Sequence, residues 1–445
     1  MRWTWFAMLA SASCLGLAHC SSDDSAAGPT NAEDAGGGTD ATTEGDTGPG
    51  PSDAATGDAA ASKIDVDGLL NAQRWGDPLA SRVVRVLDAE GTLTEITTAS
   101  DGKFHVAGVA TPYDVYVPGL LADGGLTVSD GALYTGITRD DPWISVVTSQ
   151  PPHKADFGVA TNGCSGCAIY VSHPHITDVF VGTGASVTST VHVQWYGASP
   201  ITMKFKLFEI DGTGTWTRTA PDTETLTDGM TTTGTVTLTA FGANSSTALS
   251  VTNSSGFTGQ GASVALVDAD GTAMGSSTTN SLPGSVKLPP GTTYGALVTA
   301  IGALANGTSY LMDTRYKLVS DVPAALAYTL PDATALVSPA DTAVDVLPTD
   351  KLTWKAVAGA TMYSAVVTEQ STGVSLAAYT SKPEIDLARA QKVGIVLPSQ
   401  SVHQWQASAV QGASVDTTVQ PGGAPPLYGT SQYRNTTPAW TFRPK

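Results

Sequence analysis

Two cysteines and two histidines near the middle of the chain have a spacing that suits metal binding. Cys164 and Cys167 are separated by two residues in a C-x-x-C turn, which lets both sulfur atoms face one point. His173 and His175 alternate with Pro174, and in an extended segment such residues share a face. Two thiolates and two imidazoles suit tetrahedral zinc, or copper in a distorted geometry. A zinc or copper site at these four residues is therefore one interpretation.

A disulfide between Cys164 and Cys167 is the competing interpretation, and an oxidising compartment favours it. Thioredoxin-like exchange is not indicated, because no βαβ pattern surrounds the pair. Ala168 excludes the C-x-x-C-H pattern of haem attachment. We therefore expect a disulfide and no cofactor, with zinc or copper as the alternative.

The sequence contains no familiar catalytic signature. The H-E-x-x-H, G-x-S-x-G and P-loop patterns are missing from it, and none of the seven histidines has a glutamate three positions later. Serines and carboxylates are plentiful, so a site assembled from distant residues could still exist. We expect no catalytic residues, and the alternative is an enzyme of unrecognised type within residues 159–331.

The beginning of the chain has the order of an export signal. Met1 and Arg2 form a short basic start, and residues 3–18 are an apolar run too short to cross a bilayer. Residues 21–61 are rich in Ser, Asp, Ala, Gly, Thr and Pro and contain no Lys or Arg. With almost no large apolar side chains, this segment cannot offset the entropy of ordering. We expect a disordered acidic tether there.

Leu17, Ala18 and Cys20 resemble the end of a bacterial lipoprotein signal, although His19 stands where that family usually has a small residue. The resemblance implies that Cys20 becomes the lipid-bearing N-terminus, so that the lipid bilayer is a partner. Ser21 and Ser22 would then favour the outer membrane or the cell surface. The alternative is ordinary signal cleavage, which would leave a secreted or periplasmic protein.

Composition limits the remaining possibilities. The chain has 445 residues and a formal charge of −18, which would repel a phosphate backbone, so nucleic acid binding is not expected. The residues beyond the tether are too many for one ordinary core and suggest two to four domains. No later apolar run is long and uninterrupted enough for a membrane span.

Residues 62–158 have the alternation of a small β-sandwich. Tyr113, Val115 and Val117 alternate with Asp114 and Tyr116, which predicts a half-buried strand. The sequences at 77–80, 98–104 and 112–115 resemble the carboxypeptidase regulatory-like domain. That resemblance implies a transthyretin-like sandwich and no catalysis.

Residues 332–445 resemble a fibronectin type III or immunoglobulin-like sandwich. Trp354 and Trp405 stand where such modules place core aromatic residues, and Tyr363, Ala365 and Val367 would share one buried face. Core packing is the expected role of the tryptophans, and a sugar-stacking surface is the alternative.

Residues 159–331 are rich in Thr, Ser and Gly with alternating strands, and form one long β domain or two small ones. The whole is an all-β chain of tandem β-sandwich domains: a signal at 1–20, a tether at 21–61, and sandwiches at 62–158 and 332–445 on either side of the β-rich middle region at 159–331. The expected function is a non-catalytic structural or binding role in the cell envelope. A surface protein or a glycan is the expected ligand, and metal binding is the alternative function.

Overall fold

The computed structural model describes residues 62–72, 78–121, 127–129, 131–146, 153–160, 168–172, 176–181, 188–195, 200–211, 213, 215–232, 239–240, 242–252, 257–267, 273–279, 282–289, 295–317, 324–420 and 431–445. Almost all of their regular structure is β-strand, and the two helices among them are short. The all-β class predicted from the sequence is therefore confirmed.

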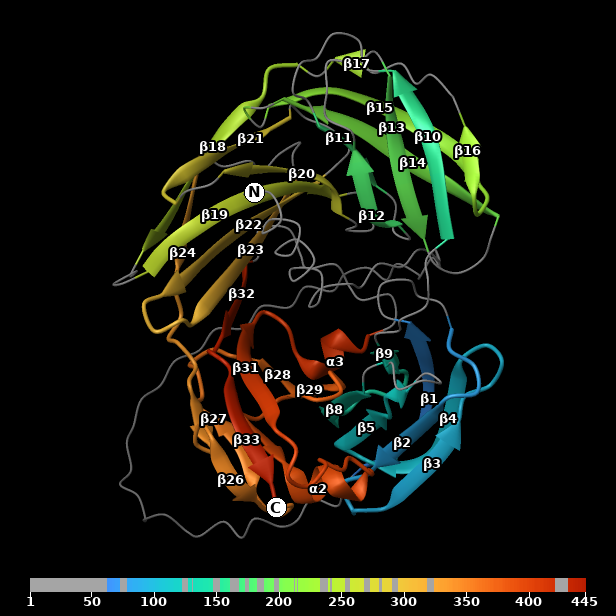
Figure 1. The fold of residues 1–445 in the computed structure, drawn as a ribbon, viewed down its shortest axis with the longest axis vertical. Helices are drawn as coiled ribbons and strands as arrows, with labels where there is room; N and C mark the ends of the chain where they lie inside the picture. Colours follow the sequence, from blue (N-terminus) through green and yellow to red (C-terminus); the bar gives the residue numbers. More distant parts are fainter. Residues whose placement is uncertain are drawn as a thin grey trace, which may run out of the picture.

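Figure 1 shows two lobes, which we call the upper and the lower lobe. The upper lobe comes from the middle of the chain and contains β10 (His153–Ala160), β11 (Ala168–Ser172), β12 (Ile176–Val181), β13 (Thr188–Trp195), β14 (Ile201–Ile210), β15 (Trp216–Leu226), β16 (Met230–Thr232), β17 (Thr239–Ala240), β18 (Ser245–Thr252), β19 (Phe257–Val267), β20 (Ala273–Thr279), β21 (Gly284–Leu288), β22 (Gly295–Leu304), β23 (Ser309–Lys317) and β24 (Ala325–Thr329).

The lower lobe joins two parts of the chain that are far apart in sequence. Its first part contains β1 (Lys63–Ala72), β2 (Val83–Leu87), β3 (Leu93–Thr97), β4 (Lys103–Ala110), β5 (Tyr113–Val117), β6 (Leu120–Leu121), β7 (Thr127–Ser129), β8 (Gly131–Ile137) and β9 (Trp143–Val146). Its second part contains β25 (Leu336–Ser338), β26 (Ala343–Val346), β27 (Lys351–Trp354), β28 (Met362–Glu369), β29 (Ser375–Thr380), β30 (Glu384–Asp386), α2 (Leu387–Lys392), β31 (His403–Gln411), α3 (Val415–Thr418), β32 (Ser431–Thr436) and β33 (Trp440–Pro444).

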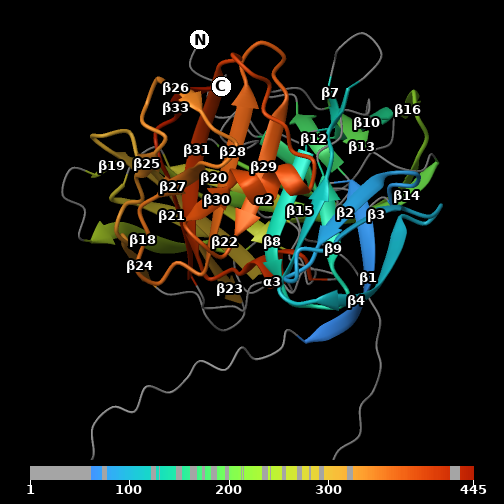
Figure 2. The same ribbon diagram turned by 90° about the horizontal axis from the view of Figure 1, so that it is seen from below.

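One sheet runs through both lobes. Its strands follow the order β20-β19-β22-β23-β32-β31-β28-β29-β8-β5-β2-β3. The two parts of the lower lobe meet where β29 pairs in parallel with β8, from Leu376 opposite Gly131 to Tyr379 opposite Tyr134. Figure 2 shows the orange β29 beside the teal β8 at this point. The two parts of the lower lobe are thus joined by backbone hydrogen bonds.

Three apolar clusters lie between facing sheets, as in β-sandwiches. One cluster lies between the β25-β27-β30 sheet and β28, β31 and β33, and it includes Trp354 and Trp405. A second lies between the β4-β1-β9 sheet and β2, β5 and β8. The third lies in the upper lobe, between the β21-β18-β24 sheet and β19, β22 and β23. The predicted tandem β-sandwich arrangement is therefore present.

The two clusters of the lower lobe each take residues from both parts of the chain. Leu87, Tyr116 and Leu133 belong to the cluster around Trp405, and Met362 and Val410 belong to the cluster around Tyr113. For this reason the prediction of a half-buried strand at residues 113–117 is wrong. All five residues of β5 are buried, since its second face packs against the carboxyl-terminal strands.

The prediction for the tryptophans is confirmed. Trp354 is 3% exposed and Trp405 is fully buried, so both pack in the core and neither forms a sugar-stacking surface. Tyr363, Ala365 and Val367 share the buried face of β28 that was expected.

Candidate functional site at the contact of β5 and helix α2

The residues singled out from the sequence lie outside the described residues. These are the lipidation candidate Cys20, the disulfide pair Cys164 and Cys167, and the further metal-ligand candidates His173 and His175. The disulfide and the zinc or copper site therefore stay predictions.

Strand β11 separates the two pairs along the chain, and this bears on the metal alternative. The strand begins at Ala168, after Cys167, and ends at Ser172, before His173. Four steps of about 3.3 Å place its end Cα atoms about 13 Å apart. A tetrahedral zinc holds its ligand atoms within about 2.3 Å. One ion could bind all four residues only if both pairs turned back along the strand, whereas a disulfide needs the cysteine pair alone.

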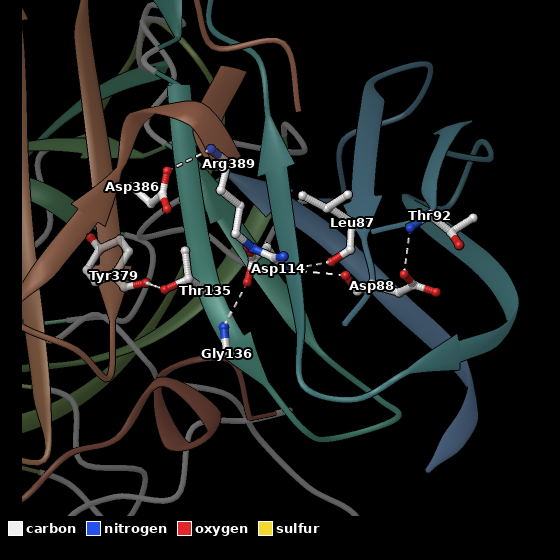
Figure 3. A network of polar contacts seen from close by, with 9 residues as sticks. All are labelled: Leu87, Asp88, Thr92, Asp114, Thr135, Gly136, Tyr379, Asp386 and Arg389. Carbon is white, nitrogen blue, oxygen red and sulfur yellow. Dashed lines mark hydrogen bonds and ion pairs between the residues drawn. The ribbon is translucent and has the colours of Figure 1, made fainter. Parts of the chain in front are cut away.

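Among the described residues, a network of hydrogen bonds and an ion pair lies around helix α2. The helix begins at an N-cap, Asp386, whose side chain accepts a hydrogen bond from the Arg389 backbone N–H at 3.0 Å. Leu387 and Ala390 are buried three positions apart, as one face of a helix requires. The cap and this face direct the Arg389 side chain toward β5, as Figure 3 shows.

Arg389 pairs there with the carboxylate of Asp114, the second residue of β5. The Asp114 side chain is 6% exposed and that of Arg389 is 37% exposed. The other oxygen of Asp114 accepts a hydrogen bond from the Gly136 backbone N–H at 3.0 Å. Arg389 also donates to the carbonyls of Leu87 and Asp88, at 3.4 and 3.3 Å. Figure 3 shows that these groups converge from β2, β5, β8 and α2.

Burial raises the pKa of the Asp114 carboxyl above its usual range, although Arg389 and the Gly136 N–H favour the charged form. A buried carboxyl with a shifted pKa is a common sign of a functional site. Here, however, the charge is already bound by a partner and a backbone amide. The arrangement can hold two parts of the chain together.

Further contacts join the two parts of the lower lobe. Arg85 on β2 donates to the carbonyl of Val393, just after α2, at 3.1 Å. The Asp416 carboxylate on α3 accepts the backbone N–H of Thr138 at 2.9 Å. Tyr134 and Tyr379 stack with ring centroids 4.8 Å apart. The pairing of β8 with β29 is thus supported on both sides by polar and aromatic contacts.

An apolar groove lies on another side of α2. It has a volume of about 70 Å³ and is lined chiefly by Val346, Leu347, Leu387, Ala390, Ile395 and Val396. Val396 at its rim is 73% exposed. Pockets for small molecules are typically ~300 to 1,000 Å³, so the groove has room for a single side chain and not for a whole metabolite.

His403 is the buried histidine of the lower lobe, at 2% exposure. Its Nδ1 lies 3.1 Å from the carbonyl oxygen of Ser401, and its ring stacks on Phe442 with centroids 5.4 Å apart. Burial lowers the pKa of the imidazole below its usual value. The ring is therefore neutral near pH 7 and packs as part of the core.

Neither a metal-binding cluster nor a membrane-spanning helix is found among the described residues. No group of three or more His, Cys, Asp or Glu side chains there is arranged to hold a metal ion. No helix in the described part of the chain has the length and apolar character needed to cross a bilayer.

No family model matches the chain, and no curated protein does. Solved structures with partial similarity include the Bacillus anthracis TIE protein, at 11% identity and a TM-score of 0.16, over 60% of this chain and 50% of that one. They also include BcpA, the major pilin subunit of Bacillus cereus, at 12% identity and a TM-score of 0.14, over 60% of this chain and 99% of that one.

A streptococcal ancillary pilin is similar at 11% identity, with a TM-score of 0.14 over 60% of this chain and 98% of the pilin. This chain spans half the length of the TIE protein. With TM-scores this low, we take neither fold nor function from these structures.

Proposed function

We propose that the protein is an exported, lipid-anchored protein of the cell envelope with a non-catalytic structural or binding role. The structural role in this proposal is carried by one observation, the contact between the two parts of the chain that form the lower lobe. Strand β8 of its first part pairs directly with β29 of its second part, and the buried carboxylate of Asp114 holds Arg389 between the same two parts. Groups that could otherwise do chemistry thus contribute to a fixed body.

The anchor is the part of the proposal that rests on Cys20. A lipid there, followed by the acidic tether of residues 21–61, would hold the folded body away from the membrane surface. A surface protein or a glycan is the expected ligand of the body, without a cofactor.

Membrane fractionation tests the anchor. Cys20→Ser should move the full-length protein from the membrane fraction to the soluble one and abolish incorporation of a labelled fatty acid. Cys14→Ser is the matched control, because Cys14 lies inside the apolar run. Unchanged membrane partition of Cys20→Ser would remove lipid anchoring from the proposal, and soluble wild-type protein without label would indicate plain secretion.

Mass spectrometry tests the cysteine pair. The proposal expects a Cys164–Cys167 disulfide, seen as resistance to thiol alkylation until a reductant is added. Stoichiometric zinc or copper, lost in His173→Ala or His175→Ala, would instead establish the metal-binding alternative.

A further inference from the structure

We infer that Asn306, at the tip of the β22–β23 hairpin, is a site of spontaneous covalent modification that converts it to aspartate and isoaspartate. The chain reverses direction through residues 305–308, where the Gly307 N–H donates to the Leu304 carbonyl at 2.9 Å. The Leu304 N–H donates to the Thr308 carbonyl at 2.8 Å. Asn306 and Gly307 are exposed on this turn.

The residue after the asparagine decides how readily the reaction proceeds. Gly307 has a φ of +86° and no Cβ, so no side chain of its own crowds its backbone nitrogen where the Asn306 side chain would approach. The Asn306 side-chain oxygen accepts the Thr308 N–H at 3.0 Å. That bond folds the side chain over its own backbone and polarises its carbonyl toward nucleophilic attack.

The reaction needs only water and a base. The Gly307 nitrogen loses its proton and attacks the side-chain carbonyl carbon of Asn306, forming the new C–N bond. The bond between that carbon and the side-chain amide nitrogen then breaks. Ammonia leaves, and a five-membered succinimide ring remains in the chain. Water adds to either carbonyl of that ring and opens it, giving aspartate or isoaspartate.

The other described asparagines provide internal controls. Asn71 and Asn435 are buried, and the Asn244 side chain is held at both ends by the backbone of Trp216. In the sequence these three are followed by Ala72, Thr436 and Ser245, each of which has a Cβ. Among the described asparagines, Asn306 alone combines exposure with a following glycine.

The position of the turn gives the modification a structural effect. A Cβ at residue 307 would lie 3.3 Å from Pro438 Cγ, so the turn contacts the segment between β32 and β33. Isoaspartate would place a new negative charge and an additional main-chain carbon at this contact between the lobes. The modified fraction of a sample would then rise with the age of the protein.

Timed peptide mapping of the full-length protein tests the inference. Incubation in ¹⁸O-labelled water at neutral pH, followed by trypsin, yields the peptide 288–315, in which Asn306 is the single asparagine. We expect the mass of amide-to-acid conversion with incorporated label, at a rate that rises with pH. The rate should be about fivefold below that of the free peptide, the factor that one backbone hydrogen bond provides.

Two variants and two contrary results make the test decisive. Asn306→Gln should abolish the conversion, because its longer side chain would need a less favourable ring. Asn306→Asp should show the charge of one product, with isoaspartate forming more slowly than in the wild type, because a carboxylate cyclises less readily than an amide. An unmodified Asn306 when the free peptide has fully converted would overturn the inference. So would a hexose-sized addition at Asn306, because Asn306-Gly307-Thr308 also fits the N-glycosylation pattern.

Discussion

The carboxylate of Asp114 and the guanidinium of Arg389 form an ion pair between strand β5 and helix α2, 275 positions apart in the chain. The two partners differ in exposure, since Asp114 is almost fully buried and more than a third of Arg389 reaches solvent. This difference predicts that substituting Arg389 and substituting Asp114 lower the free energy of unfolding by different amounts.

Arg389→Met should lower the free energy of unfolding by about 2 to 4 kcal/mol, because it leaves a buried carboxylate without its counter-charge. Asp114→Asn should lower it by about 1 to 2 kcal/mol, because water can still solvate Arg389. Urea unfolding measures both. Lys63→Met breaks an exposed pair with Glu90 and should leave the midpoint unchanged. Equal losses in the two Asp114–Arg389 variants would contradict the argument.

The same carboxyl predicts a pH effect. Its pKa in the folded protein is raised above the unfolded value of 3.8, so the folded state binds the proton more tightly. Wild type should therefore gain stability relative to Asp114→Asn as the pH falls through the folded pKa toward 3.8. Thermal unfolding of both proteins from neutral to acidic pH measures the difference. A gap that widens in favour of Asp114→Asn on acidification would show that the sign is wrong.

His403 predicts the opposite trend. Its folded pKa is lowered by burial, so the unfolded chain takes the proton first as the pH falls below 6.5. Stability should decrease from that point and level off once the pH is below the folded pKa. His403→Phe keeps a ring against Phe442 and should remove this part of the pH dependence. If the two melting profiles run parallel between pH 7 and pH 5, His403 does not contribute in this way.

The indole N–H groups of the buried tryptophans predict different stability costs for their replacement by phenylalanine. The Trp216 Nε1–H donates to the Lys287 carbonyl at 3.0 Å, whereas the Nε1–H groups of Trp354 and Trp405 have no partner among the described residues. Trp216→Phe should therefore be more destabilising than Trp405→Phe, by about 2 kcal/mol, because only the first loses a hydrogen bond. Chemical unfolding of the two variants decides the matter, and a larger loss in Trp405→Phe would refute it.

Replacing Gly394 by alanine should disturb a contact with Arg85, and Gly91 provides a matched control for this substitution. Gly394 and Gly91 have φ values of +88° and +86°, so alanine is similarly strained at both positions. A Cβ at 394 would lie 2.0 Å from Arg85 Nη1, whereas a Cβ at 91 meets nothing within 4 Å. Gly394→Ala should cost about 1 kcal/mol more than Gly91→Ala, because Arg85 must leave the Val393 carbonyl. Equal unfolding free energies would mean that the Arg85 contact contributes nothing.

Alternation in the sequence predicted strands well and the burial of their second faces poorly. The shared face of Tyr363, Ala365 and Val367 follows from period two. The burial of Asp114 and Tyr116 does not, because it depends on a partner surface formed by residues after 336. Polar residues on the outward face of a strand normally indicate contact with solvent. On β5, that face is instead covered by the second part of the lower lobe.

The site around α2 could not be predicted for a related reason. The helix has six residues, too few for a clear periodic signal, and it is held by its N-cap and by tertiary contacts. Asp114 and Arg389 also carry no local pattern that pairs them. The charge of Asp114 within an otherwise apolar strand was the one available signal, and it could indicate a solvent-facing residue equally well.

The pairing of β8 with β29 also sets the order of events at the ribosome. Thr135 donates a hydrogen bond to the Tyr379 carbonyl, 244 residues later in the chain. At translation rates of ~5 to 20 residues per second, the edge of β8 would wait roughly 10 to 50 s for its neighbour to be made. During that time its backbone is open to any other extended segment. The newly made chain should therefore depend on chaperones that bind β-edges, and the finished protein should not.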